Sequence, residues 1–218
     1  NGLLDYEFMP YEVVRPVSWG CRRNYNVIKD EVVYLDELII APYVGKIPNY
    51  VIERGISFET ANLFRLGYDA FKNNLIIPIY DVNDRLVGYS KRNIVFGGYF
   101  HSKGFKRNLY LFGENLITPG GSIILVEGFF DVMKLVQYGY RSLALMGSEL
   151  SNEQLSKLID LVGDGVVYIM MDGDKPGWEA ADKIANLLED SNVEYSIIKL
   201  AEGFDPDDLS KEELENIL

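Results

Sequence analysis

The second half of this chain alternates short apolar runs with helix-forming stretches, and this order constrains the fold more than any other feature. The apolar runs and the helical stretches between them occupy, in chain order, 123–126, 129–138, 143–146, 151–162, 166–171, 176 to about 189 and 194–200. Short strands that alternate with helices are typical of a parallel, doubly wound sheet. Sites in such sheets lie at the carboxyl ends of the strands. We therefore predict an α/β fold for this half.

The first half shows a different pattern, in which strand signals lie close together. Ser57 is placed to cap a short helix. The apolar runs 75–80 and 86–90 flank a turn and predict a β-hairpin. Pro78 lacks a backbone N–H, so the first of these strands is expected at a sheet edge or at a bulge. The first forty residues predict a mixture of strand and loop.

Charge divides the chain at nearly the same place as the pattern. The formal net charge is −12, but residues 1–115 hold 14 basic and 13 acidic residues, whereas residues 116–218 hold 7 and 20. We expect an α+β N-terminal subdomain at 1–118, with a surface for phosphate, and a cation-holding subdomain at 119–218. The stretch between Asp84 and Glu114 has no acidic residue and six basic ones: Arg85, Lys91, Arg92, Lys103, Lys106 and Arg107.

Acidic residues follow three of the predicted strands. Glu127 follows the first strand, Asp172-Gly173-Asp174 follows the third, and Asp205-Pro206-Asp207-Asp208 follows the fourth. The carboxyl ends of parallel strands share one edge of the sheet, so these carboxylates are expected along one rim. Crowded carboxylates repel one another unless a cation neutralises them.

Oxygen ligands favour Mg²⁺ or Mn²⁺ at such a rim. Cys21 is the only cysteine and His101 the only histidine, so no Cys/His zinc site can form within this chain. Any one aspartate after a strand is more often a helix cap or a solvated turn residue than a metal ligand. The ordered set of three clusters, each at a strand end, favours the metal site.

The motifs in the second half resemble those of the TOPRIM domain. Ile124 to Val132, with Glu127-Gly128 after a strand and Asp131-Val132 beyond it, is similar to the first TOPRIM motif in its primase form. Asp172-Gly173-Asp174-Lys175-Pro176-Gly177 resembles the second motif, and the segment 203–208 resembles the Asp-Pro-Asp-Asp segment of bacterial primases. The resemblance covers residues 120–210 with specific motifs.

The resemblance extends upstream, which distinguishes primases from other TOPRIM proteins. The segments 54–68, 77–92 and 109–113 are similar to primase segments that precede the TOPRIM domain. In that family, a basic ridge on the N-terminal subdomain holds the template. This chain departs from the family at 98–102, where it lacks a lysine that the family usually has. Lys103 or Arg107 would take the place of that lysine.

The resemblance to the bacterial or phage-type (DnaG-like) primase core implies a role for each matching residue. Glu127, Asp172 and Asp174 would be catalytic and would bind metal, together with Asp205 and Asp207. Gly128, Asp131 and Gly177 would support them. The nucleic-acid contacts would come from the residues Arg54, Arg92, Lys103, Lys106 and Arg107.

The function expected from this resemblance is synthesis of short RNA primers on single-stranded DNA from ribonucleoside triphosphates. Two alternatives remain open: a TOPRIM nuclease or topoisomerase fragment, and a TOPRIM module that only binds DNA or docks partners. A topoisomerase needs a nucleophilic tyrosine elsewhere, and retention of all three carboxylates disfavours the docking module.

The surroundings of the protein are also an expectation at this point. A single cysteine and no visible signal peptide in Asn1–Pro10 favour a reducing cytoplasm. No run of 18 apolar residues is present. The resemblance implies a replicative helicase and a zinc-binding module as partners outside this segment, so that the chain would be an excised core or a reduced phage form.

Overall fold

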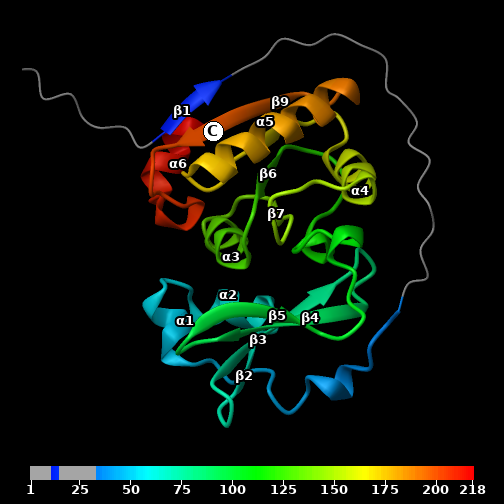
Figure 1. Cartoon of the computed structure of the whole chain (residues 1–218), viewed down its shortest axis with the longest axis vertical. Helices are drawn as coiled ribbons and strands as arrows, with labels where there is room; N and C mark the ends of the chain where they lie inside the picture. The colour runs from blue at the N-terminus through cyan, green and yellow to red at the C-terminus, as the bar shows by residue number, and fades with distance from the viewer. Residues whose placement is uncertain (1–10, 15–32) are drawn as a thin grey trace, which may run out of the picture.

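The computed structural model describes residues 11–14 and 33–218, and these form two lobes, each built on its own sheet (Figure 1). The upper lobe in this view holds a five-stranded sheet in the order β1-β9-β8-β6-β7, and the lower lobe a four-stranded sheet in the order β2-β3-β4-β5. Cys21 and the segment Asn1–Pro10 lie outside the described residues.

Four strands of the upper sheet run parallel. They are β6 (Ile123–Val126), β7 (Ser142–Ala144), β8 (Val167–Ile169) and β9 (Tyr195–Leu200). All four residues of β6 are buried, as expected for a central strand that is covered on both faces. The predicted α/β, mainly parallel, doubly wound sheet is confirmed.

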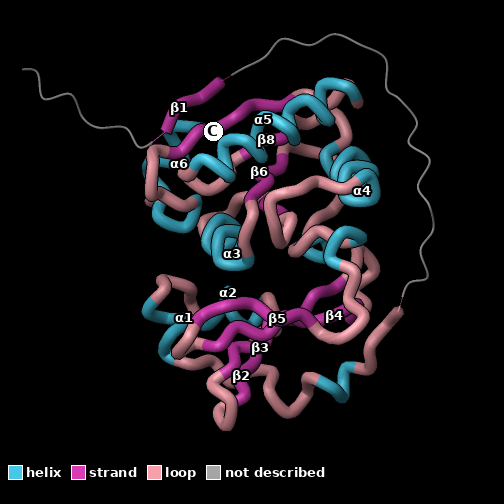
Figure 2. The backbone as a smooth tube through the Cα atoms, viewed as in Figure 1, coloured by secondary structure: helices cyan, strands magenta, loops and turns pink. Residues whose placement is uncertain are grey.

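Two pairs of helices cover the two faces of this sheet (Figure 2). The helices α4 (Asn152–Val162) and α5 (Lys175–Asp190) pack with Leu125 and Ile169 in one apolar cluster. The helices α3 (Phe129–Gln137) and α6 (Lys211–Ile217) pack with Val126 in another. Capping boxes at Ser151 and Ser210 begin α4 and α6.

The first strand that the structure describes, β1, belongs to the sheet of the upper lobe, although the residues that follow it in the chain build the lower lobe. Strand β1 (Tyr11–Val14) pairs antiparallel with β9, and Tyr11 lies opposite Leu200. A strand from the N-terminal part of the chain therefore forms the edge of the C-terminal sheet. This pairing joins distant segments, and no local sequence pattern predicts it.

The lower lobe is an antiparallel meander. Its strands are β2 (Gly67–Asp69), β3 (Asn74–Tyr80), β4 (Leu86–Asn93) and β5 (Gly97–His101), with α1 (Asn49–Glu53) and α2 (Phe58–Leu63) beside them. Ser57 caps α2 as predicted, and β3 and β4 form the predicted hairpin.

Pro78 lies in an interior strand of this sheet and not in an edge strand. Strand β2 begins opposite Ile76 and runs away from Pro78, so β3 has only β4 as a paired strand at Pro78. The proline is tolerated because one side of the strand is unpaired there, and the pairing with β4 is irregular one residue later, between Ile79 and Tyr80.

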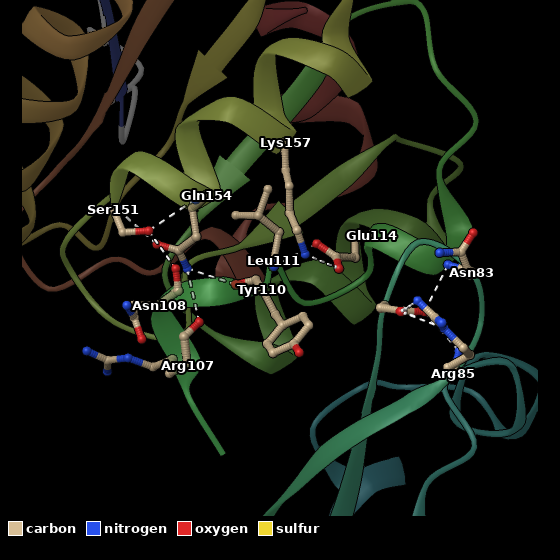
Figure 3. Close-up of polar contacts among 11 residues, drawn as sticks. Asn83, Arg85, Arg107, Asn108, Tyr110, Leu111, Glu114, Ser151, Gln154 and Lys157 are labelled. Atoms are coloured by element: carbon tan, nitrogen blue, oxygen red, sulfur yellow. Dashed lines mark hydrogen bonds and ion pairs between the residues drawn. The ribbon is translucent and has the colours of Figure 1, made fainter. Parts of the chain in front are cut away.

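A polar clamp fastens the segment between the lobes to α4 (Figure 3). Gln154, which is buried, donates from Nε2 to the carbonyl of Tyr110 at 2.8 Å, and Ser151 Oγ donates to the carbonyl of Asn108 at 2.5 Å. One helical turn further on, Lys157 Nζ lies 2.6 Å from Glu114 Oε1. These contacts fix the segment 108–114, which joins the lobes, to α4 of the upper lobe.

Aromatic packing closes the rest of the interface between the lobes. Phe112 stacks on Phe64 of the lower lobe at 5.2 Å between ring centroids and meets the edge of Phe129 at 4.8 Å. None of the helices that the structure describes is long and apolar enough to cross a membrane.

Candidate metal centre and nucleic-acid interface

Four carboxylates gather where β6, β8 and β9 end, and we call Glu127, Asp172, Asp174 and Asp205 the acidic rim. Glu127 directly follows β6, and the chain reaches Asp172 three residues after β8. Because these strands are parallel neighbours, their carboxyl ends bring the predicted residues together. The charges of the other rim carboxylates raise the pKa values of Glu127 and Asp172. Among the described residues, three or more ligand atoms within 4.8 Å of one another are found only for Asp205, Asp207 and Asp208, so the rim as a whole is spaced more widely.

Among the carboxylates of the acidic rim, Asp172 lies in the environment that most disfavours its negative charge. Burial, followed by the charges of Glu127, Asp205 and Asp174, raises the pKa of Asp172 to about 7. Its Oδ1 is buried and has no hydrogen-bond partner. A buried acceptor without a partner costs free energy unless something satisfies it. The pKa of Glu127 is also raised, by burial first and then by Asp174 and Asp205.

Asp174 has a second task that the sequence also allows. Its Oδ1 accepts a hydrogen bond of 2.7 Å from the backbone N–H of Gly177, so Asp174 caps α5, and its side chain is exposed. This is the helix-cap role that any single aspartate after a strand suggests. The cap uses one carboxylate oxygen and leaves the other available.

Glycines allow the backbone to fold tightly behind these carboxylates. A Cβ on Gly173 would overlap the carbonyl oxygens of Ala201 and Phe204, and a Cβ on Gly177 would overlap the carbonyl of Asp172. Gly173 N–H donates to Phe204 O at 2.7 Å, which ties the loop of Asp172 to the loop before Asp205. The glycines thereby hold two parts of the rim together.

The segment after β9 forms a compact acidic turn. Ligand atoms of Asp205, Asp207 and Asp208 all lie within 4.8 Å of one another, around the 3₁₀ helix η4 (Pro206–Asp208). Asp208, which the sequence places in this cluster but which was not assigned as a metal ligand, accepts a hydrogen bond from the backbone N–H of Asp205 at 2.9 Å. Asp207 forms an ion pair with Arg54. Two of the three carboxylates are thus already engaged.

Asp131 supports the rim from inside. Its Oδ2 accepts a hydrogen bond of 3.0 Å from the backbone N–H of Gly128, next to Glu127. Burial, followed by the charges of Asp207 and Asp172, raises the pKa of Asp131 to about 8. A Cβ on Gly128 would overlap the carboxylate of Asp131, so the glycine allows this close contact.

The rim fits a hard divalent cation. Its side chains supply only carboxylate oxygens, which Mg²⁺ and Mn²⁺ prefer. The unpartnered Oδ1 of Asp172 and the raised pKa values of Asp172 and Glu127 both indicate negative charge that the protein alone does not satisfy. A bound cation would supply the missing partner.

The predicted nucleic-acid contacts divide into two groups. Lys103, Lys106 and Arg107 are exposed, although Arg107 Nη1 also donates to the carbonyl of Met146 at 2.7 Å. Arg92, by contrast, donates from Nε to the hydroxyl of Tyr50 at 2.7 Å and is half-buried.

Arg54 is the member of the set that faces the acidic rim. It lies in the interface between the lobes, where it pairs with Asp207. Tyr50 and Met146, which hold two of these arginines, were not expected from the sequence. Met146, two residues after β7, has φ of +59°, which is unusual for a residue with a side chain.

Comparison with known proteins gives the same family as the motifs. The Toprim-like family matches residues 124–210. A DNA primase of Aquifex aeolicus is 33% identical over 174 residues, which cover 75% of this chain and 34% of that protein. A DNA primase of Staphylococcus epidermidis is 33% identical over 233 residues, covering 94% of this chain and 38% of that protein.

A solved structure is similar in fold as well. The Aquifex aeolicus primase structure with zinc-binding and RNA polymerase domains matches with a TM-score of 0.67 and 29% identity, covering 78% of this chain and 54% of that chain. The present chain therefore spans little more than a third of the length of the two primases with which its sequence is compared.

Proposed function

We propose that this chain, which is a DnaG-like primase core containing a TOPRIM domain, synthesises short RNA primers on single-stranded DNA. In chemical terms it would be a nucleotidyltransferase, a DNA-directed RNA polymerase of the primase type, and its substrates would be ribonucleoside triphosphates. The observation that carries the proposal is the acidic rim, with the unpartnered Asp172 Oδ1, at the carboxyl edge of the sheet and facing a lobe that bears an acid-free basic stretch.

Glu127, Asp172, Asp174 and Asp205 would hold the divalent cation, with Mg²⁺ as the first candidate and Mn²⁺ as the second. Divalent ions in such sites neutralise the charge of the triphosphate and of the attacking and leaving oxygens. Asp131 would keep Gly128 and hence Glu127 in place, and Gly177 would let the Asp172 and Asp174 backbone turn sharply. The rim needs no zinc ligand from this chain.

The basic stretch would place the template. Lys103, Lys106 and Arg107 are exposed on the lower lobe, and Arg92 lies near them in sequence. Contacts from such residues to phosphates position a strand without reading its sequence. A replicative helicase and a zinc-binding module are proposed as partners outside this segment, because the Aquifex aeolicus primase structure includes a zinc-binding domain. We place the activity in the cytoplasm, where bacterial DNA replication occurs.

The test is direct synthesis. The chain is incubated with single-stranded DNA, the four ribonucleotides and Mg²⁺ or Mn²⁺, and the products are separated by length. Short RNA that requires template, metal and Asp172 is expected. If DNA is bound and no RNA forms under any metal, the module would be one that only binds or docks. If the DNA is cut, the nuclease alternative holds.

A further inference from the structure

Arg54 is anchored at the boundary of the lobes by its neighbours in the chain. Gln137, at the end of α3, donates from Nε2 to the carbonyl of Gly55 at 2.9 Å and accepts from the backbone N–H of Ser57 at 2.7 Å. The backbone just after Arg54 is therefore fixed to the helix that begins next to Glu127. The direction of the Arg54 side chain is set by the upper lobe.

The guanidinium of Arg54 is engaged on two sides by residues of that lobe. Its Nη2 lies 2.5 Å from Asp207 Oδ2, and its Cζ lies 4.3 Å from the centroid of the Phe130 ring. The side chain of Asp207 is only 10% exposed and that of Arg54 is 32% exposed. A charge-assisted hydrogen bond in such a shielded place is much stronger than a surface ion pair.

The ion pair joins a turn of the acidic centre to the other lobe. Helix η4 packs against α3, and Arg54 reaches the same turn from the segment between α1 and α2. Arg54 is also the cation that acts on Asp205: burial and Asp207 raise the pKa of Asp205, and Arg54 opposes them. The guanidinium of Arg54 is therefore held against the turn that carries Asp205, Asp207 and Asp208.

We propose that Arg54 is a positioning residue of the acidic rim: its ion pair with Asp207 withholds that carboxylate from the bound cation and fixes the Asp205–Asp208 turn against α3. The inference rests on the proposed function only in that the rim binds a divalent cation. The family resemblance implies that Arg54 contacts the template and that Asp207 binds the metal. This proposal gives neither role to these two residues.

The test measures metal binding without synthesis. Mn²⁺ is titrated into the whole chain, and free Mn²⁺ is followed by electron paramagnetic resonance for the wild type, Arg54→Ala, Asp207→Asn and the double variant. Arg54→Ala frees one carboxylate and removes one positive charge, so Mn²⁺ should bind roughly threefold to tenfold more tightly. The double variant loses one charge of each sign and should stay within about twofold of the wild type. Asp207→Asn loses a negative charge but no direct ligand, so it should weaken Mn²⁺ binding by less than about tenfold.

The same variants distinguish a template role. Binding of single-stranded DNA is measured against salt, and Arg54→Ala should leave the salt slope unchanged. Loss of about 0.7 in the slope would place Arg54 on a phosphate and overturn the proposal. A more than roughly tenfold loss of Mn²⁺ affinity in Asp207→Asn would make Asp207 a ligand and would overturn it as well.

Arg65 provides a matched control. Its Nη2 lies 2.6 Å from Asp84 Oδ2 and its Cζ lies 4.3 Å from the centroid of Tyr80, so it reproduces the contacts of Arg54 far from the rim. Arg65→Ala should leave Mn²⁺ binding unchanged. Thermal melts check that each variant folds. If Arg54→Ala does not fold, the Mn²⁺ affinity of Asp207→Asn decides whether Asp207 is a direct ligand. A wild type that binds Mn²⁺ in this pattern without making RNA would refute the proposed function and leave this inference standing.

Discussion

Lys157 reaches from α4 to Glu114, whose side chain is fully buried, and places its ammonium 2.6 Å from the carboxylate. Glu114 also accepts a hydrogen bond from the backbone N–H of Leu111 at 3.0 Å. Burial nevertheless outweighs Lys157, so the pKa of Glu114 stays above its usual value. The pair holds the segment between the two lobes, and it does so at the cost of burying a charge.

Lys157→Ala should therefore destabilise the protein by about 3–5 kcal/mol, because it leaves Glu114 buried without its cation. Urea unfolding at pH 8 measures the loss. The cost should shrink toward pH 5, where the raised pKa lets Glu114 take up a proton. The control is Lys175→Ala, which removes an exposed pair with Glu179 at 3.7 Å and should change stability by less than about 1 kcal/mol. A loss below about 1 kcal/mol for Lys157→Ala would show that the pair contributes nothing net.

Asp172→Asn should abolish metal-dependent RNA synthesis and keep or raise the melting temperature of the metal-free protein. The change removes one negative charge from a site where burial and four neighbouring carboxylates already disfavour it. Product analysis and thermal melts with a chelator measure the two effects. A variant that polymerises normally would remove Asp172 from the catalytic set. A variant that melts far lower would mean that the carboxylate is structural.

The metal-free protein should become more stable as the pH falls from about 8 toward 5. The pKa values of Asp131 and Asp172 are raised to about 8 and about 7, so the folded state binds protons that the unfolded state has released. Stability from these groups is complete below their unfolded pKa values and is lost as the pH rises through the folded ones. Each group adds a slope of at most about 1.4 kcal/mol per pH unit.

Asp131→Asn tests this pH dependence because it keeps an oxygen that can accept from Gly128 N–H. The variant should flatten the fall in stability between pH 5 and 8 and be more stable than the wild type at pH 8. Urea unfolding with a chelator at each pH gives the measurement. An unchanged pH profile would mean that Asp131 is not a protonated group in the folded protein.

The sequence predicts what depends on neighbouring residues. Strand, turn and helix follow one another locally, so the ends of β6, β8 and β9, and with them Glu127, Asp172 and Asp205, can be placed in advance. The cap that Asp174 makes with Gly177 is likewise the local role that a single aspartate after a strand suggests. Each of these contacts spans only a few residues of chain.

Contacts between distant segments could not be predicted in this way. Arg54 and Asp207 are 153 residues apart, and β1 pairs with β9 from the opposite end of the chain. Pro78 also depends on a distant segment: the edge or bulge that the proline predicts arises because β2 begins opposite Ile76 and the pairing with β4 is irregular after Ile79. Such features depend on the packing of whole elements.

Template binding by the basic stretch should depend on salt in proportion to the phosphates contacted. Lys103→Ala and Lys106→Ala should each weaken binding of single-stranded DNA with little dependence on sequence, and each lost contact should reduce the salt slope by about 0.7. The matched control is Lys72→Ala, which removes an exposed lysine of the same lobe outside the basic stretch and should leave the slope unchanged. Fluorescence anisotropy across a salt series provides the measurement. Equal slopes for all three variants and the wild type would assign these lysines to a solvated surface, and a preference for one base would contradict contact through phosphates.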